Sequence, residues 1–282
     1  NSTNYLHWEA RRRFTGLPEA SRYASKDWRW RVSSSHNNHG EKLNDQFRMS
    51  REGQLRDGSY EYAQVNVNSA GISDTLLRGN GIARLPANMN AYFEYERPRK
   101  GNWAHEVEVE AFGGGLAGNR KLGSAFWYGA TYFINDAFSL NAGLNLVRRP
   151  DWLIWQGAAQ GDLVGAFDGR ETTLRAGLDW NIDPRQELRV KLEAIAISAR
   201  AHDAWRFDAA GHAVAASDTV EDFQVRNLGF QVRYRYELAP LSYLYVVYAR
   251  GGYEQRTGTE GVDGLLQDSL RLRDDEQLVV KL

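Results

Sequence analysis

Residues 174–193 alternate between apolar and polar side chains on both sides of a four-residue turn. Before the turn, apolar side chains occupy the even positions Leu174, Ala176, Leu178, Trp180 and Ile182, with polar or small residues between them. After residues 183–186 the alternation resumes with Leu188, Val190 and Leu192. A period of two predicts β-strands whose opposite faces differ in polarity.

The same pattern recurs along nearly the whole chain and predicts thirteen strands. They are expected at 4–14, 24–34, 44–51, 59–67, 89–97, 103–112, 124–134, 137–148, 171–182, 186–199, 222–237, 241–250 and 275–282. Very short connections (98–102, 135–136, 183–186, 237–241) alternate with long ones (68–88, 113–123, 149–170, 201–221, 251–274). Outer-membrane barrels have short periplasmic turns and long external loops. The sequence therefore predicts an all-β fold, a transmembrane antiparallel up-and-down β-barrel.

The predicted strand count is odd, whereas single-chain bacterial barrels have an even number of strands. We therefore expect about 14 strands in the intact barrel. The final strand also ends at Leu282 without the terminal aromatic residue that such barrels usually carry. Residues 1–282 are accordingly expected to form a single barrel domain that is cropped at both ends.

Composition is compatible with this architecture. The mean hydropathy is -0.58 and the chain has no run of about 18 apolar residues, so no transmembrane helix is predicted. A barrel needs no such run, because only every second residue of a strand faces lipid. The absence of Cys excludes disulfides and thiolate metal sites, and the net charge of -1 gives no reason to expect nucleic acid as a partner.

Aromatic residues are frequent close to the short turns. Tyr and Trp on the lipid face of a barrel collect where hydrocarbon meets the headgroups. Alternation places all members of this predicted periplasmic girdle on the outward face: Tyr95, Trp103, Tyr132, Phe138, Trp180, Tyr236 and Tyr243. The girdle favours a membrane barrel over a soluble β-sandwich, and it predicts contact with outer-membrane lipid and lipopolysaccharide.

Charged residues on the predicted inward face divide into two groups, four to six strands apart. An acidic wall consists of Glu94, Glu96, Glu106, Glu108 and Glu110, and a basic wall consists of Arg175, Arg189, Lys191, Arg233 and Arg235. In a barrel of about 14 strands these walls would lie on roughly opposing sides and filter ions. The alternative is that the charges pair within a filled interior and only keep it hydrated.

The segment 33–41 is a second candidate site, in a predicted external loop. His36 and His39 with the nearby Glu41 have the chemistry of a divalent-cation site, and a Ser beside a His is found in outer-membrane phospholipases. A solvated turn rich in Ser, Asn and Gly has the same composition. No cofactor, metal site or catalytic residue is therefore predicted here.

The stretch 234–248 (YRYELAPLSYLYVVY) resembles an uncharacterised family of Gram-negative outer-membrane proteins. Shorter stretches at 78–81, 95–100, 181–182, 226–230 and 272–275 share the resemblance, which covers about residues 70–282. Members of that family typically carry an N-terminal domain similar to carbohydrate-binding family 9, followed by a C-terminal barrel. The resemblance implies an outer-membrane location and an upstream carbohydrate-binding-like domain outside these residues, and it supplies no catalytic residues.

The function expected from these features is a passive pore or a membrane anchor, and the resemblance suggests carbohydrate-related solutes. Two alternatives stay open at this point. One is an outer-membrane hydrolase with an external-loop site near His36 and His39. The other is a structural scaffold barrel that binds an envelope protein partner.

Overall fold

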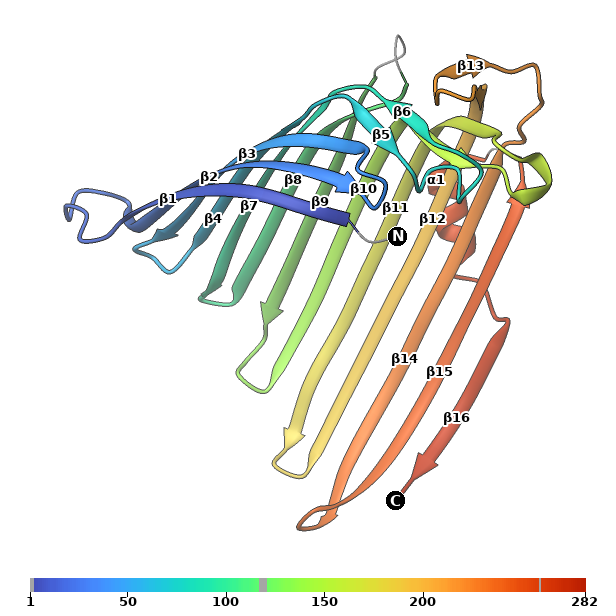
Figure 1. Cartoon of the computed structure of the whole chain (residues 1–282). Helices are drawn as coiled ribbons and strands as arrows, with labels where there is room; N and C mark the ends of the chain where they lie inside the picture. Colours follow the sequence, from blue (N-terminus) through green and yellow to red (C-terminus); the bar gives the residue numbers. More distant parts are fainter. Residues whose placement is uncertain (1–2, 117–120, 259) are drawn as a thin grey trace.

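The computed structural model describes residues 3–116, 121–258 and 260–282, most of which lie in strands (Figure 1). Within these residues one antiparallel sheet contains fourteen strands: the short β13 (Ala213–Ala215) pairs off the main path, and the other thirteen lie side by side in chain order. Their order is β1 (Thr3–Phe14), β2 (Tyr23–Asn37), β3 (Lys42–Leu55), β4 (Tyr60–Asn68), β7 (Asn88–Lys100), β8 (Trp103–Gly114), β9 (Lys121–Phe133), β10 (Phe138–Trp155), β11 (Val164–Asp183), β12 (Gln186–Phe207), β14 (Phe223–Ala239), β15 (Ser242–Thr257) and β16 (Asp275–Lys281). The predicted all-β, antiparallel up-and-down arrangement is confirmed.

The connections separate into two classes at opposite ends of the sheet. From β7 onward, those at the short-turn end are 101–102, 134–137, 184–185 and 240–241. Those at the long-loop end include 69–87, 208–222 and 258–274; residues 117–120 and 259 lie outside the described residues. The long-loop end carries elements that the sequence did not predict: β5 (Gly71–Ser73), β6 (Ala83–Leu85), a 3-10 turn (Ala158–Gln160), β13 (Ala213–Ala215) and α1 (Val262–Ser269) (Figure 1).

Several strands extend further toward the long-loop end than predicted. β10 and β11 continue through much of 149–170. The sequence predicted a loop there because a β-bulge interrupts the alternation. One extra β10 residue stands between Arg149 and Trp152, whose partners are Gly169 and Phe167. A second bulge adds His202 to β12 at the neighbouring position. A bulge reverses the face of every residue beyond it, so a search for strict alternation ends there.

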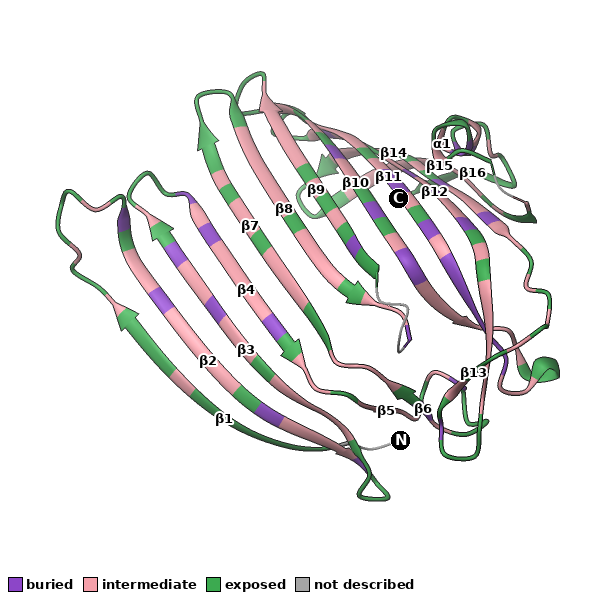
Figure 2. Ribbon diagram, turned by 90° about the horizontal axis from the view of Figure 1, so that it is seen from above, coloured by how far each residue is buried: buried purple, intermediate pink, exposed green. Residues whose placement is uncertain are grey.

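The sheet is curved, with a concave and a convex face (Figure 2). Directly paired residues of neighbouring strands share a face, so the pairings define rows that run across the sheet. One convex row consists of Tyr132, Leu140, Leu178, Val190, Val232 and Tyr248. A neighbouring concave row consists of Thr131, Asn141, Gly177, Lys191, Gln231 and Ala249. Apolar side chains thus line the convex face and polar ones the concave face.

The two edges of the sheet are β1 and β16, and they run in the same direction. Twelve reversals separate them along the thirteen-strand path. Within the described residues neither edge strand pairs with the other, so the sheet is open. Because β1 and β16 are parallel, direct pairing between them would not complete an all-antiparallel ring.

The protein has little hydrophobic core for its size. Its accessible surface is 16369 Å², about a third more than the ~12,000 Å² expected of a compact soluble protein of 32.0 kDa. A cluster of buried apolar residues lies instead at the long-loop end, where Leu77 and Ala83 pack with Val164. The Arg84 N–H donates to the Gly211 carbonyl (2.7 Å), which fastens the β5–β6 hairpin to the turn before β13.

Helix α1 lies on the convex side of the sheet at the long-loop end (Figure 2). The Ser269 hydroxyl donates to the Ile195 carbonyl of β12 (3.1 Å), and Asp268 lies 3.2 Å from the guanidinium of Arg226 on β14. Ala194 and Ala196 of β12 are fully buried in this part of the convex face. No helix among the described residues has the length and apolar character needed to cross a membrane.

Candidate functional site on the concave face

The five carboxylates of the predicted acidic wall lie together on the concave face. Glu94 pairs with Glu108 and Glu96 pairs with Glu106 across β7 and β8, and Glu110 follows in the next row. Within the described residues none of the five has a basic partner within 4.0 Å. Neutral groups donate hydrogen bonds to two of them: the Tyr92 hydroxyl to Glu94 (3.2 Å) and the Asn90 amide to Glu110 (3.1 Å). This wall is a concentration of uncompensated negative charge.

The predicted basic wall differs, because acidic residues are built into it. Glu187, whose side chain is only 7% exposed, lies 3.3 Å from Arg233 and 3.0 Å from Arg235, and it also pairs with Arg189. The three arginines and Glu187 come from the adjacent strands β12 and β14. One buried carboxylate therefore has three partly exposed guanidinium groups around it, and their charges offset the cost of removing that carboxylate from water.

The other half of the basic wall is also partly neutralised. Arg175 on β11 pairs with Glu193 on β12, with 2.6 Å between Nε and Oε2. Lys191 has no ion pair among the described residues. The nearest members of the two walls, Glu106 and Arg175, belong to one cross-strand row with β9 and β10 between them, a spacing of about 14 Å along the sheet. The closest separation is thus three strands rather than the expected four.

A further set of basic residues on β1–β3 was missed from the sequence. Asp27, whose side chain is 6% exposed, forms ion pairs with Arg11 and Arg13 and lies 3.8 Å from the guanidinium of Arg29. Arg29 also pairs with Glu52 (3.0 Å). These residues share the concave face, since Asp27 pairs with Glu52 across β2 and β3. Alternation within the predicted strands 4–14 and 24–34 was the signal that could have placed Arg11, Arg13, Asp27 and Arg29 there.

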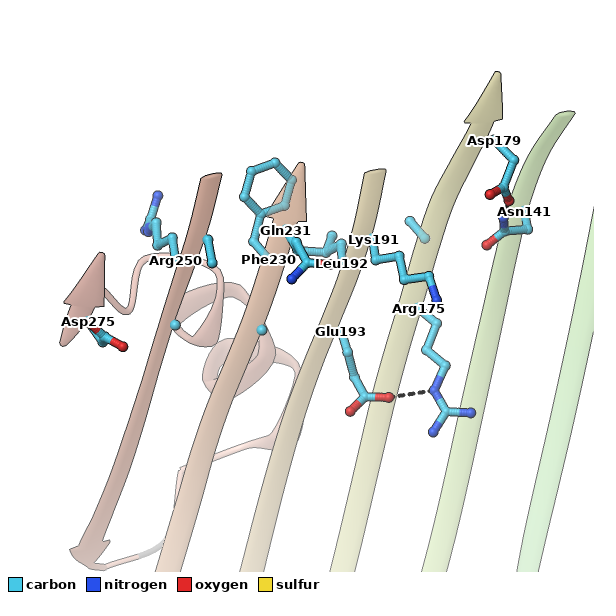
Figure 3. Close-up of a pocket in the computed structure, with 14 residues that line it drawn as sticks. Asn141, Arg175, Asp179, Lys191, Leu192, Glu193, Phe230, Gln231, Arg250 and Asp275 are labelled. Atoms are coloured by element: carbon cyan, nitrogen blue, oxygen red, sulfur yellow. Dashed lines mark hydrogen bonds and ion pairs between the residues drawn. The ribbon is translucent and has the colours of Figure 1, made fainter. Parts of the chain in front are cut away.

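A cavity of about 590 Å³ opens on the concave face between β10 and β16 (Figure 3). The backbone of Gly229 and Gly251, which are direct cross-strand partners without side chains, forms the floor of this cavity. Charged and amide side chains surround this floor: Asn141, Arg175, Asp179, Lys191, Glu193, Gln231 and Asp275. Figure 3 shows Arg175 reaching toward Glu193 in front of the strands, while α1 lies behind them. The cavity therefore belongs to the polar face.

Most of the predicted aromatic girdle occupies the convex face near the short-turn end. Trp103 and Tyr132 are direct partners with ring centroids 4.7 Å apart, and Phe138 and Trp180 are direct partners at 5.6 Å. Tyr95 pairs with Val107, and Tyr236 pairs with Leu244, on the same face.

Tyr243 does not share this face. It pairs with Glu237 and lies 5.4 Å below the guanidinium of Arg235, so its ring belongs to the concave side. The expectation that it lies beside Tyr236 was wrong, because the tight turn at 240–241 shifts the register by one residue and thereby exchanges the faces.

The segment 33–41 forms the end of β2 and a tight turn. The Asn37 side chain organises this turn: its Oδ1 accepts from the backbone N–H groups of His39 and Glu41, and its Nδ2 donates to Glu41 (2.7 Å). Ser35 and His36 are consecutive strand residues and so point to opposite faces. Among the described residues no three His, Asp or Glu side chains form a group suited to a metal ion.

No protein family, curated protein or solved structure was found to match the chain.

Proposed function

We propose that the chain forms the wall of a membrane-spanning β-barrel and that it acts as a passive pore for small hydrophilic solutes. The observation that carries this proposal is the band of exposed apolar side chains on the convex face. Its members are Trp8, Val32, Phe47, Val67, Met89, Phe93, Val109, Phe126, Leu140, Leu146 and Trp180, all more than a third exposed. Soluble proteins rarely expose a contiguous apolar surface of this extent, whereas lipid requires it.

The path of this band across the sheet supports a tilted barrel wall. Trp30 on β2 and Gln224 on β14 belong to one cross-strand row. On β2 this row is the middle of the apolar band, but on β14 the middle of the band is Val232, eight residues further along. From β2 to β14 the centre of the band shifts by ~26 Å along the strands, over a sheet width of ~43 Å made up of nine strand-to-strand steps. This drift corresponds to a strand tilt of about 30°, near the ~35–45° of membrane barrels.

Closure of this barrel needs at least one strand antiparallel to both edges. The parallel directions of β1 and β16 make one such strand, and a total of fourteen, the simplest closed form. That strand would place apolar residues beside Trp8 and Leu278, which lie on the convex face, and polar residues on the concave face.

The concave face would then line an aqueous lumen. The uncompensated carboxylates of β7 and β8 favour cations in their vicinity, whereas most of the basic wall is paired with Glu187 and Glu193. We therefore propose a pore whose cation preference depends on the acidic wall. The outer membrane as its location, lipopolysaccharide contact and an upstream carbohydrate-binding-like domain follow from the resemblance and the turn pattern, and they are part of the same proposal.

Single-channel recording in planar bilayers tests the pore. The full-length protein is expected to give discrete conductances, with a reversal potential in a KCl gradient that indicates cation preference. Changing Glu106, Glu108 and Glu110 to Gln should shift that potential toward anions. Glu254→Gln, on the convex face and paired with Arg226, is the matched control and should leave it unchanged. Bilayers without channel conductance, or open channels whose reversal potential is unchanged by the triple substitution, would contradict the proposal.

A further inference from the structure

The indole of Trp127 lies flat against the concave wall. Trp127 is a concave residue of β9, directly opposite Glu108 of β8. A Cβ atom added to Gly143 would come within 2.3 Å of a Trp127 ring carbon, and one added to Gly129 within 3.3 Å. Gly129 and Gly143 are direct partners on β9 and β10. The indole therefore rests on a shelf of two glycines, which only the absence of side chains allows.

The same row of residues leads from this shelf into the cavity of Figure 3. It contains Gly129, Gly143, Arg175, Glu193, Gly229 and Gly251 in that order. The guanidinium of Arg175 lies over the Trp127 ring, 5.2 Å from the ring centroid, and also forms an ion pair with Glu193 on β12. At Gly229 the position of a Cβ has no atom within 4 Å. An aromatic ring and an open polar recess are thus contiguous on one wall.

The recess offers hydrogen bonds of both kinds without a strong excess of charge. Arg175 and Lys191 are donors, the carboxylates of Asp179, Glu193 and Asp275 are acceptors, and Asn141 and Gln231 provide amides that are both. Arg175 and Glu193 already neutralise each other, so a charged ligand would have to break this pair. A volume of about 590 Å³ lies within the range of small-molecule sites. These properties fit a neutral ligand with many hydroxyl groups.

We propose that Trp127 and this recess form a subsite for the pyranose rings of a neutral oligosaccharide. The apolar C–H face of one ring displaces the Arg175 guanidinium from the indole and packs there, and hydroxyl groups of that ring and the next exchange hydrogen bonds with Arg175, Lys191, Glu193 and Gln231. This subsite rests on the proposed pore, because a lumen is what brings a solute to the concave face. It also deepens that proposal by naming the class of solute.

The test uses the full-length protein, refolded in detergent for calorimetry and in planar bilayers for conductance, with maltohexaose as the probe. Maltohexaose should bind and should transiently block the open channel, whereas polyethylene glycol of similar mass, which has no pyranose rings, should not. Trp127→Ala should weaken binding about tenfold, equivalent to about 1.4 kcal/mol. Gly143→Ala should weaken it similarly, because the added methyl group displaces the indole while the Trp remains. Trp180→Ala, on the convex face, is the matched control and should leave binding unchanged.

Each outcome bears on the subsite separately from the pore. Open channels that maltohexaose never blocks, or equal block in the parent and in both lumen variants, would overturn the subsite and leave the pore standing. Tighter binding of a hexamer of glucosamine than of maltohexaose would overturn the inference that the subsite prefers a neutral ligand. Calorimetric binding that depends on Trp127 in a protein without conductance would uphold the subsite and refute the pore. Circular dichroism of each variant establishes that the strands have formed.

Discussion

Ala142 offers the sharpest test of whether the convex face contacts lipid. It is exposed, it lies at the centre of the outward residues from Phe138 to Leu146 on β10, and its direct partners Ala130 and Ala176 are also small. It is four residue steps from either end of this stretch, about 13 Å along the strand and ~11 Å in depth at the tilt inferred above. Ala142→Arg therefore places a charge near the bilayer midplane without creating a cavity or a steric clash.

The expected cost is about 2–4 kcal/mol, the usual cost of Arg at the midplane of the lipid face, or roughly a 30-fold to 900-fold change in the folding equilibrium. Equilibrium unfolding by guanidinium in phosphatidylcholine vesicles, followed by Trp fluorescence, measures it. Two variants are controls: Ala142→Leu should cost nothing, and Thr131→Arg, on the concave face of the adjacent strand, should change stability by less than about 0.5 kcal/mol. Equal small losses for both Arg variants would refute the assignment of the convex face to lipid.

Two further predictions concern the long-loop end, which lies outside the apolar band. Leu77→Ala, at a residue 1% exposed, should cost the β5–β6 hairpin about 2–5 kcal/mol and speed proteolysis within 69–87. Leu238→Ala, at an exposed residue near the end of β14, should not, and unchanged cleavage in Leu77→Ala would show that the hairpin is not held by this contact. The backbone N–H of Phe207, and secondly Arg206, hold the pKa of the Asp162 carboxyl below its usual range. Its contribution to stability is therefore present above the unfolded pKa of about 3.9 and lost as pH falls through the lower folded value. Asp162→Asn should abolish the increase in proteolysis of 156–163 between pH 4 and pH 3, and an identical acid response in the parent and the variant would contradict this.

Local pattern was sufficient for the strands but not for their ends. Periodicity placed all thirteen long strands of the sheet, because a side-chain period of two is a property of a single strand. It failed at 149–170, where a bulge between Arg149 and Trp152 breaks the alternation although the strands continue, and it failed at the start of 201–221, where a bulge at His202 does the same. It also missed α1, whose residues 262–269 are too few to show a clear helical period and which is stabilised by contacts with Ile195 and Arg226.

The candidate site was predictable to the extent that it depends on face and strand. Glu94, Glu96, Glu106, Glu108 and Glu110 fall on adjacent strands joined by a short turn, so alternation alone brought them together. Ion pairing was not predictable, because the partners Arg175 and Glu193 meet only when β11 and β12 are aligned. Tyr243 was assigned to the wrong face because a single-residue shift at a turn cannot be read from the flanking patterns.

The sequence by itself determined which side chains of a strand share the polar face and which share the apolar face, because polarity alternates from one residue to the next. Only the tertiary structure decided which residues of different strands are neighbours. Register has no local signal: sliding one strand by two residues keeps both faces intact and changes every cross-strand contact. The glycine shelf under Trp127, the three arginines around Glu187 and the drift of the apolar band across the sheet all depend on that register. They appear only once the chain is folded.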